Sequence, residues 1–572
     1  MRWIFSRDRL LLIAKLGLLC YFVAATNPGS PARLQAIGIQ AGLAVFATVW
    51  ATALFSMLLV AFSPSRATRI VWTVLFCGAT LWVRSYELIT AKHLGLEDFE
   101  QLLQLRPFVG DVLDTYQRFI LIALGQSFIG VLAINLPPYS LPRLAWRDVA
   151  TWARVTPVVP IFMIAAILYA RGGQGSHGLP AQYNPLAFAG LLTLERLTER
   201  PLPPRAGVEL PLSAAQELKD IVLVIDESIR GDLLDINHPG GIKTRLDRFS
   251  SETVNFGIAA SATDCSAETN VTLRYGARRS TYLRDIYTRP SIWLYAQTAG
   301  YEPVYIDGQR YNGDLHNNMT AQERREINRF IQLSEFVKPA DKDITIARII
   351  RTVMRTPGRH FILVNKSGTH FPFEGKYPES HTVYAPTMRA TFFSNETDPQ
   401  GVAWQGQETP LERAKFLNSY KNAVEWNVGF FFQRLLAGLD LTDAVVVYTS
   451  DHGQDFHEDG RPGWRTHCDS GNAPPGEGIV PFVIITSQPE LLARLRKAAE
   501  MNRGRISHFN VFPSLLLLMG YSGSDLLARD DFERTIFNDL TGNDMRFLSD
   551  YFVRFGRKPV WNSIEPSPES AR

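Results

Sequence analysis

The sequence predicts two parts: an N-terminal α-helical bundle of about five membrane spans, and a C-terminal α/β domain with a largely parallel sheet. Three observations lead to this prediction. The chain has 572 residues, which is too long for one compact core. Residues up to about position 170 are strongly apolar, whereas the rest of the chain is mixed. After residue 219, short apolar runs alternate with helix-like segments, as is typical of α/β domains.

The overall composition excludes several classes of protein. The formal net charge of +3 is too small for a nucleic-acid-binding surface, so we expect no nucleic-acid partner. Four cysteines in 572 residues cannot hold together a disulfide-dense secreted scaffold. A hydrophobic content of 46% also excludes a disordered chain.

Five apolar stretches form the predicted bundle. A span requires about 20 mostly apolar residues, and residues 34–65 carry no charge at all. Residues 70–83 are the weakest candidate, because the stretch is short and Arg84 and Glu87 follow it. In the first stretch, we expect Lys15 to snorkel towards the membrane surface. The other stretches are the residues after Leu10, residues 119–142 and residues 155–170.

The distribution of arginines sets the orientation of the bundle. With the N-terminus inside, only Arg33, Lys92 and Arg106 lie in the outer loops clear of a span end, in agreement with the positive-inside rule. Five spans then place everything after Arg171 outside the cytoplasm. We expect no cleaved signal peptide, because no small-residue cleavage site stands out and further spans follow. The inside segments hold Arg2, Arg7, Arg9, Arg66, Arg69, Arg143 and Arg147.

These observations divide the chain into three regions. Residues 1–171 are the predicted transmembrane domain, and residues 91–116 within it are expected to form a helix at the outer interface. Residues 172–218 are rich in Gly and Pro around one amphipathic stretch, which predicts a linker at the membrane surface. Residues 219–572 are the predicted globular domain.

The globular domain contains five predicted strands. They are continuous and rich in β-branched residues, which is typical of strands buried on both faces. Helix-like segments such as residues 411–439 separate them, so we expect a largely parallel sheet with helices on both sides. The strands are residues 221–226, 302–307, 360–365, 444–450 and 479–486.

Carboxylate and imidazole side chains follow three of these strands. Glu227 comes directly after the first strand, Asp451 and His452 come after the fourth, and His370 lies a few residues beyond the third. Parallel strands deliver such residues to one edge of the sheet. Mixed carboxylate and imidazole ligands suit zinc, and suit manganese less well. Each residue alone is more simply explained as a helix cap or a turn, so the prediction depends on their joint occurrence.

A hydroxyl nucleophile is predicted near the start of a further helix. Residues 255–280 have the pattern of a strand, a polar turn and a helix that begins near Ala267. Thr269 would lie in the first helical turn, where free backbone N–H groups attract an anion such as phosphate. From spacing alone, however, the simpler interpretation is that Ser266 or Thr269 only caps the helix.

At this point the motifs resemble the alkaline phosphatase/sulfatase superfamily, and within it the membrane-bound phosphoethanolamine transferases. The resemblance covers nearly the whole chain, and it implies an alkaline-phosphatase-like or sulfatase-like fold. It implies Glu227, Thr269, Asp451 and His452 as metal ligands, Thr269 as the nucleophile, and His370 and His467 as substrate-binding residues; His457 is a weaker candidate than His467. The matching segments are DESIRGD (226–232), CSAET (265–269), GTHFP (368–372), SDHGQ (450–454) and ISHFNVF (506–512).

The chain departs from the family pattern around the nucleophile. Lipid A-modifying members bracket it with a disulfide, but the second cysteine would fall near Tyr275. Cys265 and Cys468 are the two cysteines outside the predicted spans; a bridge between them is conceivable, and free thiols are equally allowed. The chain also lacks the C/S-x-P-x-R motif of formylglycine sulfatases, since Ala267 and Thr269 stand where proline and arginine belong. The missing bracket resembles the core-sugar transferases more than the lipid A enzymes, and it leaves the acceptor open between lipid A, a core sugar and another glycan.

The resemblance implies a zinc-dependent transferase of the bacterial inner membrane with its catalytic domain in the periplasm. The donor would be phosphatidylethanolamine, the acceptor a lipopolysaccharide component such as lipid A, and the intermediate a phospho-threonine. One zinc ion is expected, with room for a second. A phosphoglycerol transferase acting on a periplasmic glucan is the alternative enzyme, and a non-catalytic membrane scaffold is the alternative outside enzymes.

Overall fold

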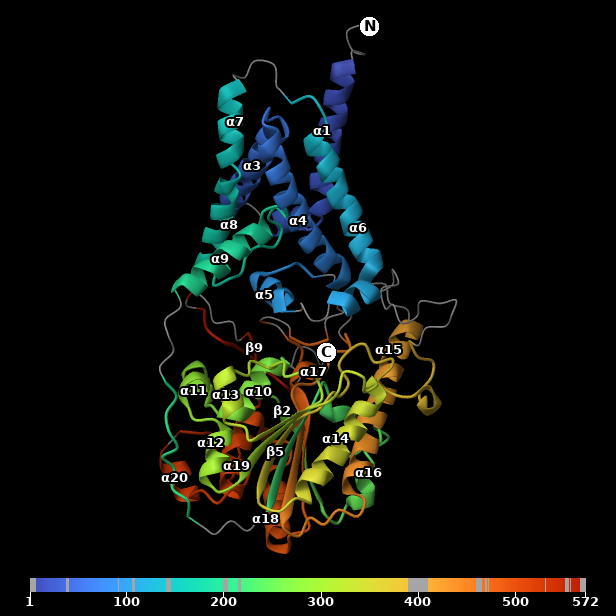
Figure 1. Ribbon diagram of the computed structural model, residues 1–572, viewed down its shortest axis with the longest axis vertical. Helices are drawn as coiled ribbons and strands as arrows, with labels where there is room; N and C mark the ends of the chain where they lie inside the picture. Colours follow the sequence, from blue (N-terminus) through green and yellow to red (C-terminus); the bar gives the residue numbers. More distant parts are fainter. Residues whose placement is uncertain are drawn as a thin grey trace.

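The computed structural model has a bundle of helices above an α/β domain (Figure 1). It describes residues 7–37, 41–90, 92–104, 109–139, 146–198, 204–213, 218–388, 410–458, 466–468, 471, 473–529, 531–550, 555 and 557–565. The expected fold class, a helical N-terminal region followed by a mostly parallel α/β domain, is confirmed.

Four helical segments are long and apolar enough to cross a membrane, within the described part of the chain. They are Arg9–Thr26, Gly42–Ala61, Tyr116–Asn135 and Asp148–Ala170. They belong to α1 (Arg7–Thr26), α3 (Ala41–Ala61), α6 (Val109–Asn135), and α7 (Trp146–Val155) continued by α8 (Val158–Ala170). Four of the five expected spans are therefore confirmed.

The fifth expected span does not meet the same criterion. Residues 70–83 lie in α4 (Arg66–Thr90), which has 25 residues and runs beside α6 (Figure 1). The length suffices at about 1.5 Å per residue. The helix carries Arg66, Arg69, Arg84 and Glu87, and these charges lower its apolar character. Its inward face is nevertheless buried, and Arg84 is held by Glu87 at a distance of 2.5 Å.

Lys15 lies inside the bundle, so the expectation that it snorkels is wrong. Its side chain is fully buried, and its ammonium donates hydrogen bonds to the carbonyls of Ala61, Leu136 and Pro138. Because α3 and α6 end here, their free carbonyl groups provide the negative ends of two helix dipoles. The lysine therefore links α1 to the ends of α3 and α6.

Shorter helices surround the outer end of the bundle. They are α2 (Ser30–Ile37), α5 (Leu96–Gln104) and α9 (Asn184–Thr198). The predicted interface helix corresponds to α5, and the amphipathic stretch of the linker forms α9. After α9, the backbone N–H groups of Ala206 and Ser213 donate hydrogen bonds to the carbonyls of Thr288 and Gly520, so this half of the linker runs along the α/β domain. Residues 199–203 and 214–217 of the linker lie outside the described residues.

The α/β domain is built on an eight-stranded sheet of order β4-β3-β5-β1-β6-β7-β2-β8. Neighbouring strands are parallel except at β7, which is antiparallel to both β6 and β2. All five predicted strands are present. The strands are β1 (Asp220–Asp226), β2 (Thr253–Ala260), β3 (Glu302–Asp307), β4 (Arg329–Gln332), β5 (His360–Asn365), β6 (Ala444–Ser450), β7 (Ile479–Ile485) and β8 (Ile506–Ser507).

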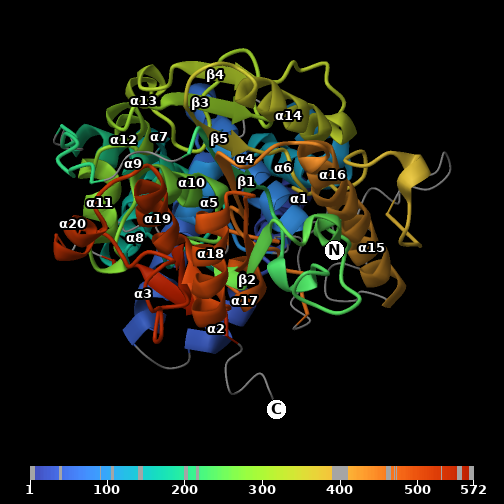
Figure 2. The same ribbon diagram turned by 90° about the horizontal axis from the view of Figure 1, so that it is seen from below.

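Helices cover both faces of this sheet (Figure 2). One face packs against α12 (Ile292–Thr298), α18 (Pro489–Asn502) and α19 (Val511–Leu518). The other packs against α14 (Pro339–Met354), α15 (Pro410–Val424) and α16 (Phe431–Leu436), and a π-helical turn at Glu425–Phe430 joins the last two. The remaining elements are α10 (Ser266–Tyr275), α11 (Tyr282–Thr288), α13 (Ala321–Arg325), α17 (Pro475–Gly478), α20 (Gly523–Ala528), and the hairpin of β9 (Arg546–Asp550) with β10 (Val560–Ser563).

The chain returns to the bundle between the two strands of this hairpin. The Phe555 ring packs on Tyr169 with a centroid separation of 4.7 Å. The Arg557 guanidinium lies 3.8 Å from the Glu97 carboxylate of α5. The α/β domain is thus attached to the bundle at a second place besides the linker.

Candidate metal centre and nucleophile site

The predicted metal ligands meet at the sheet edge that faces the helical bundle. Glu227 follows β1, and Asp451 and His452 follow β6, which pairs with β1 in parallel. In Figure 1, α10 and α17 mark this edge, whereas α18 lies at the opposite end of the domain. One ligand atom from each of the three side chains lies within 4.8 Å of the other two, and all three residues are buried.

The donor atoms of this cluster are arranged for a cation. The His452 Nδ1 donates to the Gly453 carbonyl at 2.7 Å, which leaves Nε2 directed at Glu227 Oε1 (3.5 Å) and Asp451 Oδ2 (3.6 Å). Asp451 Oδ1 accepts the backbone N–H groups of Ser228 and His452, but Oδ2 is buried and accepts no hydrogen bond from the described residues. A buried carboxylate oxygen without a donor is costly. Two carboxylates and one imidazole therefore fit a zinc ion.

The electrostatics of the protein alone support the same interpretation. Burial, followed by the neighbouring Glu227 carboxylate, raises the pKa of Asp451 to about 7. Burial lowers the pKa of His452, but the Asp451 and Glu227 carboxylates outweigh it and raise that pKa to about 9. Without a metal ion, the protonated His452 ring thus provides the positive charge beside the two carboxylates.

A buried ion pair at the ends of β1 and β5 fixes the backbone next to the cluster. Lys366 and Asp226 form an ion pair inside the sheet, and Tyr448 donates a 2.8 Å hydrogen bond to the same carboxylate. The other oxygen of Asp226 accepts the backbone N–H of Glu227 at 2.9 Å. This network fixes the backbone from which the Glu227 side chain projects.

The structure brings Ser266, and not Thr269, to the cluster. Ser266 is the first residue of α10, and its Oγ lies 3.2 Å from His452 Nε2 and 3.3 Å from Glu227 Oε2. Thr269 is fully buried one turn later, and its Oγ1 lies 3.1 Å from both the backbone N and the Oγ1 of Thr263. The described structure contains no contact between this hydroxyl and the three ligands. As nucleophile and metal ligand, Thr269 stays a prediction that this geometry does not favour.

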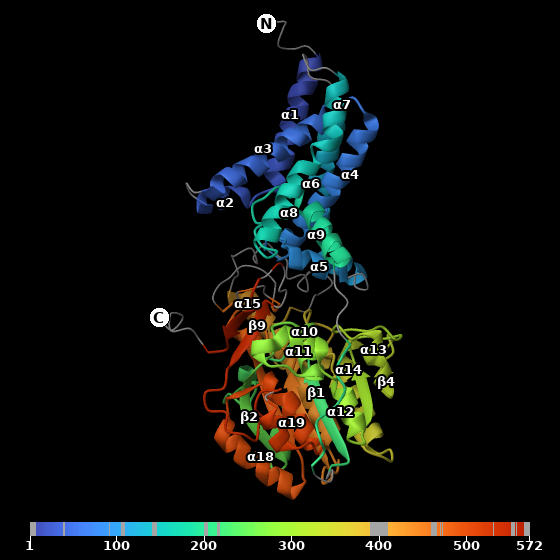
Figure 3. The same cartoon turned by 90° about the vertical axis from the view of Figure 1, so that its left-hand side faces the viewer.

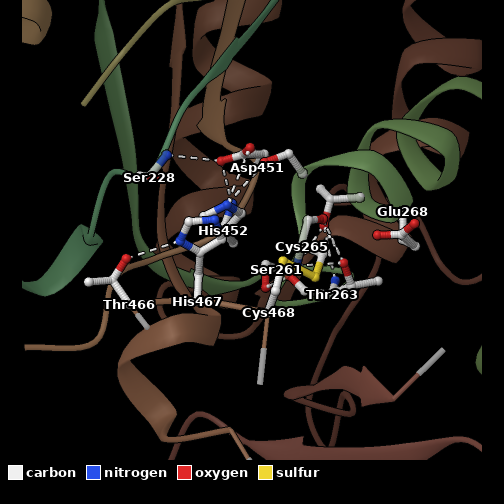
Figure 4. The surroundings of a disulfide bond; sticks show 12 residues. Ser228, Ser261, Thr263, Cys265, Glu268, Asp451, His452, Thr466, His467 and Cys468 are labelled. Carbon is white, nitrogen blue, oxygen red and sulfur yellow. Dashed lines mark hydrogen bonds and ion pairs between the residues drawn. A yellow bond between two sulfur atoms is a disulfide. The ribbon is translucent and has the colours of Figure 1, made fainter. Parts of the chain in front are cut away.

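The two predicted substrate histidines lie beside the ligands. The His467 ring stacks on His452 with a centroid separation of 4.3 Å (Figure 4). The exposed His370 ring approaches His467 with a centroid separation of 5.3 Å. His457, the weaker candidate, is buried, and its Nδ1 lies 3.5 Å from an oxygen of Asp455.

Cys265 and Cys468 form a disulfide, which settles the alternative that the sequence left open. The bond joins the residue before α10 to the residue after His467, across a sequence separation of 203 (Figure 4). The Cys468 N–H also donates to the Asp264 carbonyl at 2.9 Å. The loop that carries His467 is therefore fastened to the start of the helix that carries Ser266.

One further residue at the cluster was not anticipated from the sequence. Gln309 Nε2 donates a 2.9 Å hydrogen bond to Glu227 Oε2. Gln309 lies two residues beyond the end of β3, so the rule that directed attention to the ends of the other strands applies to it as well. The same amide donates to the Lys366 carbonyl at 2.9 Å, so it ties the Glu227 carboxylate to the end of β5.

The comparison with protein families agrees with this geometry. The sulfatase family model matches residues 219–521. The chain belongs to the sulfatase family. This confirms the superfamily that the motifs of the sequence resemble.

Curated relatives of this sulfatase-family protein are phosphoethanolamine transferases, the enzyme class predicted from the motifs. It is 25% identical over 200 residues to the Kdo(2)-lipid A phosphoethanolamine 7''-transferase of Escherichia coli, covering 33% of this chain and 31% of that protein. It is 22% identical over 448 residues to the phosphoethanolamine transferase CptA of Salmonella typhimurium, covering 72% and 73%. The match thus spans about a third of the length of the first relative.

A solved structure shares the whole architecture. The integral membrane protein lipooligosaccharide phosphoethanolamine transferase A from Neisseria meningitidis superposes with a TM-score of 0.62 and 17% sequence identity. The superposition covers 91% of this chain and 99% of that protein. At this identity the likeness shows the fold, including a helical bundle in front of the α/β domain.

Proposed function

We propose that this protein transfers phosphoethanolamine from phosphatidylethanolamine to a lipopolysaccharide component, either lipid A or a core sugar. The bundle would anchor it in the bacterial inner membrane, with the α/β domain in the periplasm. The observation that carries the proposal is the Ser266 hydroxyl, which lies in the first turn of a helix, in contact with Glu227 and His452. The names of the curated relatives supply the headgroup and the class of acceptor.

Glu227, Asp451 and His452 would hold a zinc ion, because one donor atom from each lies within 4.8 Å of the other two. Bound zinc would lower the pKa of a coordinated hydroxyl and stabilise negative charge on phosphoryl oxygens. No second set of three such ligands is present in the described residues, so one ion is proposed.

Ser266 replaces Thr269 as the proposed nucleophile. Its Oγ attacks the phosphorus of the donor in line, the bond from phosphorus to the diacylglycerol oxygen breaks, and phosphoethanolamine stays on the serine. The backbone N–H groups at the start of α10 favour the negative phosphoryl group. An acceptor phosphate or hydroxyl then attacks the phosphoserine and releases Ser266.

His467 and His370 are proposed to bind the phosphoryl oxygens and to protonate the leaving oxygen. Their rings lie side by side at the open side of the cluster, where the substrate would enter. In the first step an imidazolium would give its proton to the departing diacylglycerol oxygen, and in the second the neutral ring would accept a proton from the acceptor.

The position of the site relative to the bundle suits lipid substrates. The edge that carries Ser266 faces the bundle, so the donor would not have to leave the bilayer completely (Figure 1). Confinement of donor and acceptor to one membrane surface raises their effective concentration.

The test is headgroup transfer by the purified full-length protein in lipid vesicles. Phosphatidylethanolamine labelled in its ethanolamine group should pass the label to added lipopolysaccharide, and zinc chelation should stop the transfer. Transfer from phosphatidylglycerol labelled in its headgroup glycerol, with none from phosphatidylethanolamine, would replace the proposal with a phosphoglycerol transferase. Zinc binding without turnover of either lipid would support a scaffold role instead.

A further inference from the structure

A cavity of about 430 Å³ lies at the outer end of the bundle, away from the metal centre. Its walls come from α2, α3, α8 and the loop that follows α8. Gly42 and Ala170, which end two of the apolar spans, both line it. The cavity therefore lies at the depth where hydrocarbon gives way to headgroups. Figure 3 shows α2 projecting from the side of the bundle at this level.

Two arginines line the polar side of this cavity. Neither Arg33 nor Arg171 makes a side-chain hydrogen bond or an ion pair with any described residue, and none of the described residues that line the cavity is a carboxylate. Basic residues are uncommon on the translocated side of a membrane protein. Two arginines beside one cavity, with no carboxylate among the described lining residues, leave a local positive charge. An anionic ligand would neutralise this charge.

The loop after α8 is shaped to hold both arginine side chains. A Cβ at Gly175 would lie 2.9 Å from Arg171 Cδ, and one at Gly178 would lie 2.5 Å from Arg33 Cβ. Both glycines have positive φ values, and the Gly178 carbonyl accepts hydrogen bonds from Ser30 and Trp50. The loop is therefore anchored, and its glycines allow it to pack directly on the stems of the two arginines.

Apart from the two arginines and His177, the residues that line the cavity are apolar or glycine. Ile37, Val45, Phe46 and Ile167 are among its lining residues, and they continue the hydrophobic surface of the spans. An apolar wall beside two guanidinium groups matches a molecule with an acyl chain and an anionic head. A free phosphate ion would leave this apolar wall uncovered.

We propose that this cavity binds one anionic phospholipid, with its phosphate between Arg33 and Arg171 and an acyl chain along the apolar wall. A zwitterionic lipid is disfavoured, because its ammonium group would find no carboxylate there. The site is separate from the metal centre, and the proposal does not depend on the transferase activity.

Native mass spectrometry of the full-length protein in detergent tests this proposal. Phosphatidylglycerol and phosphatidylcholine with the same acyl chains are titrated separately. We expect wild-type protein to bind phosphatidylglycerol at least tenfold more tightly. Arg33→Gln and Arg171→Gln should each weaken that binding about fivefold, and the double variant should weaken it about thirtyfold. Arg66→Gln removes the same charge from an exposed position at the start of α4 and should change nothing.

The double lysine variant, Arg33→Lys with Arg171→Lys, keeps both charges and should retain most of the binding. Thermal unfolding of each variant shows that it is folded; if the double glutamine variant is not, the two single variants decide. Equal affinities for the two lipids would overturn the proposal, as would equal losses in Arg66→Gln and in the double variant. Binding of a phosphorylated glycolipid with no binding of phosphatidylglycerol would also overturn it.

Discussion

Substituting the two hydroxyl residues of α10 one at a time separates their roles. Ser266→Ala removes the hydroxyl that lies 3.2 Å from His452 Nε2 and 3.3 Å from Glu227 Oε2. If this oxygen forms the covalent intermediate, transfer falls by at least about 10³-fold, the scale on which loss of a nucleophile acts. The fold and the zinc content should be unchanged, because the alanine leaves no buried group without a partner.

Thr269→Ala should have the opposite outcome. Its Oγ1 accepts the buried backbone N–H of Thr263, and leaving that donor unpaired costs about 1–3 kcal/mol of stability. We expect a lower melting temperature and transfer within about tenfold of wild type, because the hydroxyl does not contact the metal ligands. Thr269→Ser keeps the oxygen and is the matched control, so its stability should lie close to that of wild type.

Mass spectrometry of protein trapped with labelled donor locates the adduct directly. Both hydroxyls fall in the tryptic peptide 249–274, and fragmentation distinguishes them. An adduct on Thr269, or full transfer by Ser266→Ala, would refute the assignment and restore the threonine predicted from the sequence.

Three further predictions concern metal, pH and the disulfide. Glu227→Gln should lower zinc affinity at least about a hundredfold, because a charged ligand is lost, and elemental analysis should show the loss of zinc. Glu490→Gln, at an exposed position of α18, should have no effect; equal zinc content in the two variants would contradict the site. Burial lowers the pKa of His508 to about 3, so the unfolded chain binds the proton first and stability falls as the pH drops below about 6.5. At pH 5 this should cost about 2 kcal/mol relative to pH 8, and thermal melts of His508→Gln should lack that component. Replacing both Cys265 and Cys468 by serine should lower the free energy of unfolding by up to about 5 kcal/mol, because the disulfide closes a loop of 203 residues. Transfer should fall while zinc is retained. Unchanged turnover would show that the disulfide does not position His467.

The strands were predictable because they are buried on both faces. The runs at 302–307, 360–365 and 444–450 coincide with β3, β5 and β6, since continuous β-branched residues have few other stable arrangements. The direction of β7 was not predictable. An apolar run does not show in which direction its strand crosses the sheet. The antiparallel direction of β7 is seen only in its pairing with β6 and β2.

The site was partly predictable for a similar reason. Strand ends identify Glu227, Asp451 and His452, because parallel strands deliver their carboxyl ends to one edge. The choice between Ser266 and Thr269 depends on how α10 sits against the sheet. The two residues are three positions, or about 4.5 Å, apart along the helix, and sequence spacing does not say which of them meets the metal ligands.

The attachment of the C-terminal segment to the bundle limits how the α/β domain can move. The linker holds this domain on one side, and Phe555 and Arg557 hold it through Tyr169 and Glu97. A body held at two separate points swings mainly about the line that joins them, so its tilt towards the lipid surface has one principal axis. Loss of both contacts, of Phe555 with Tyr169 and of Arg557 with Glu97, would free the remaining rotations and let the distance between the catalytic groups and the bilayer vary.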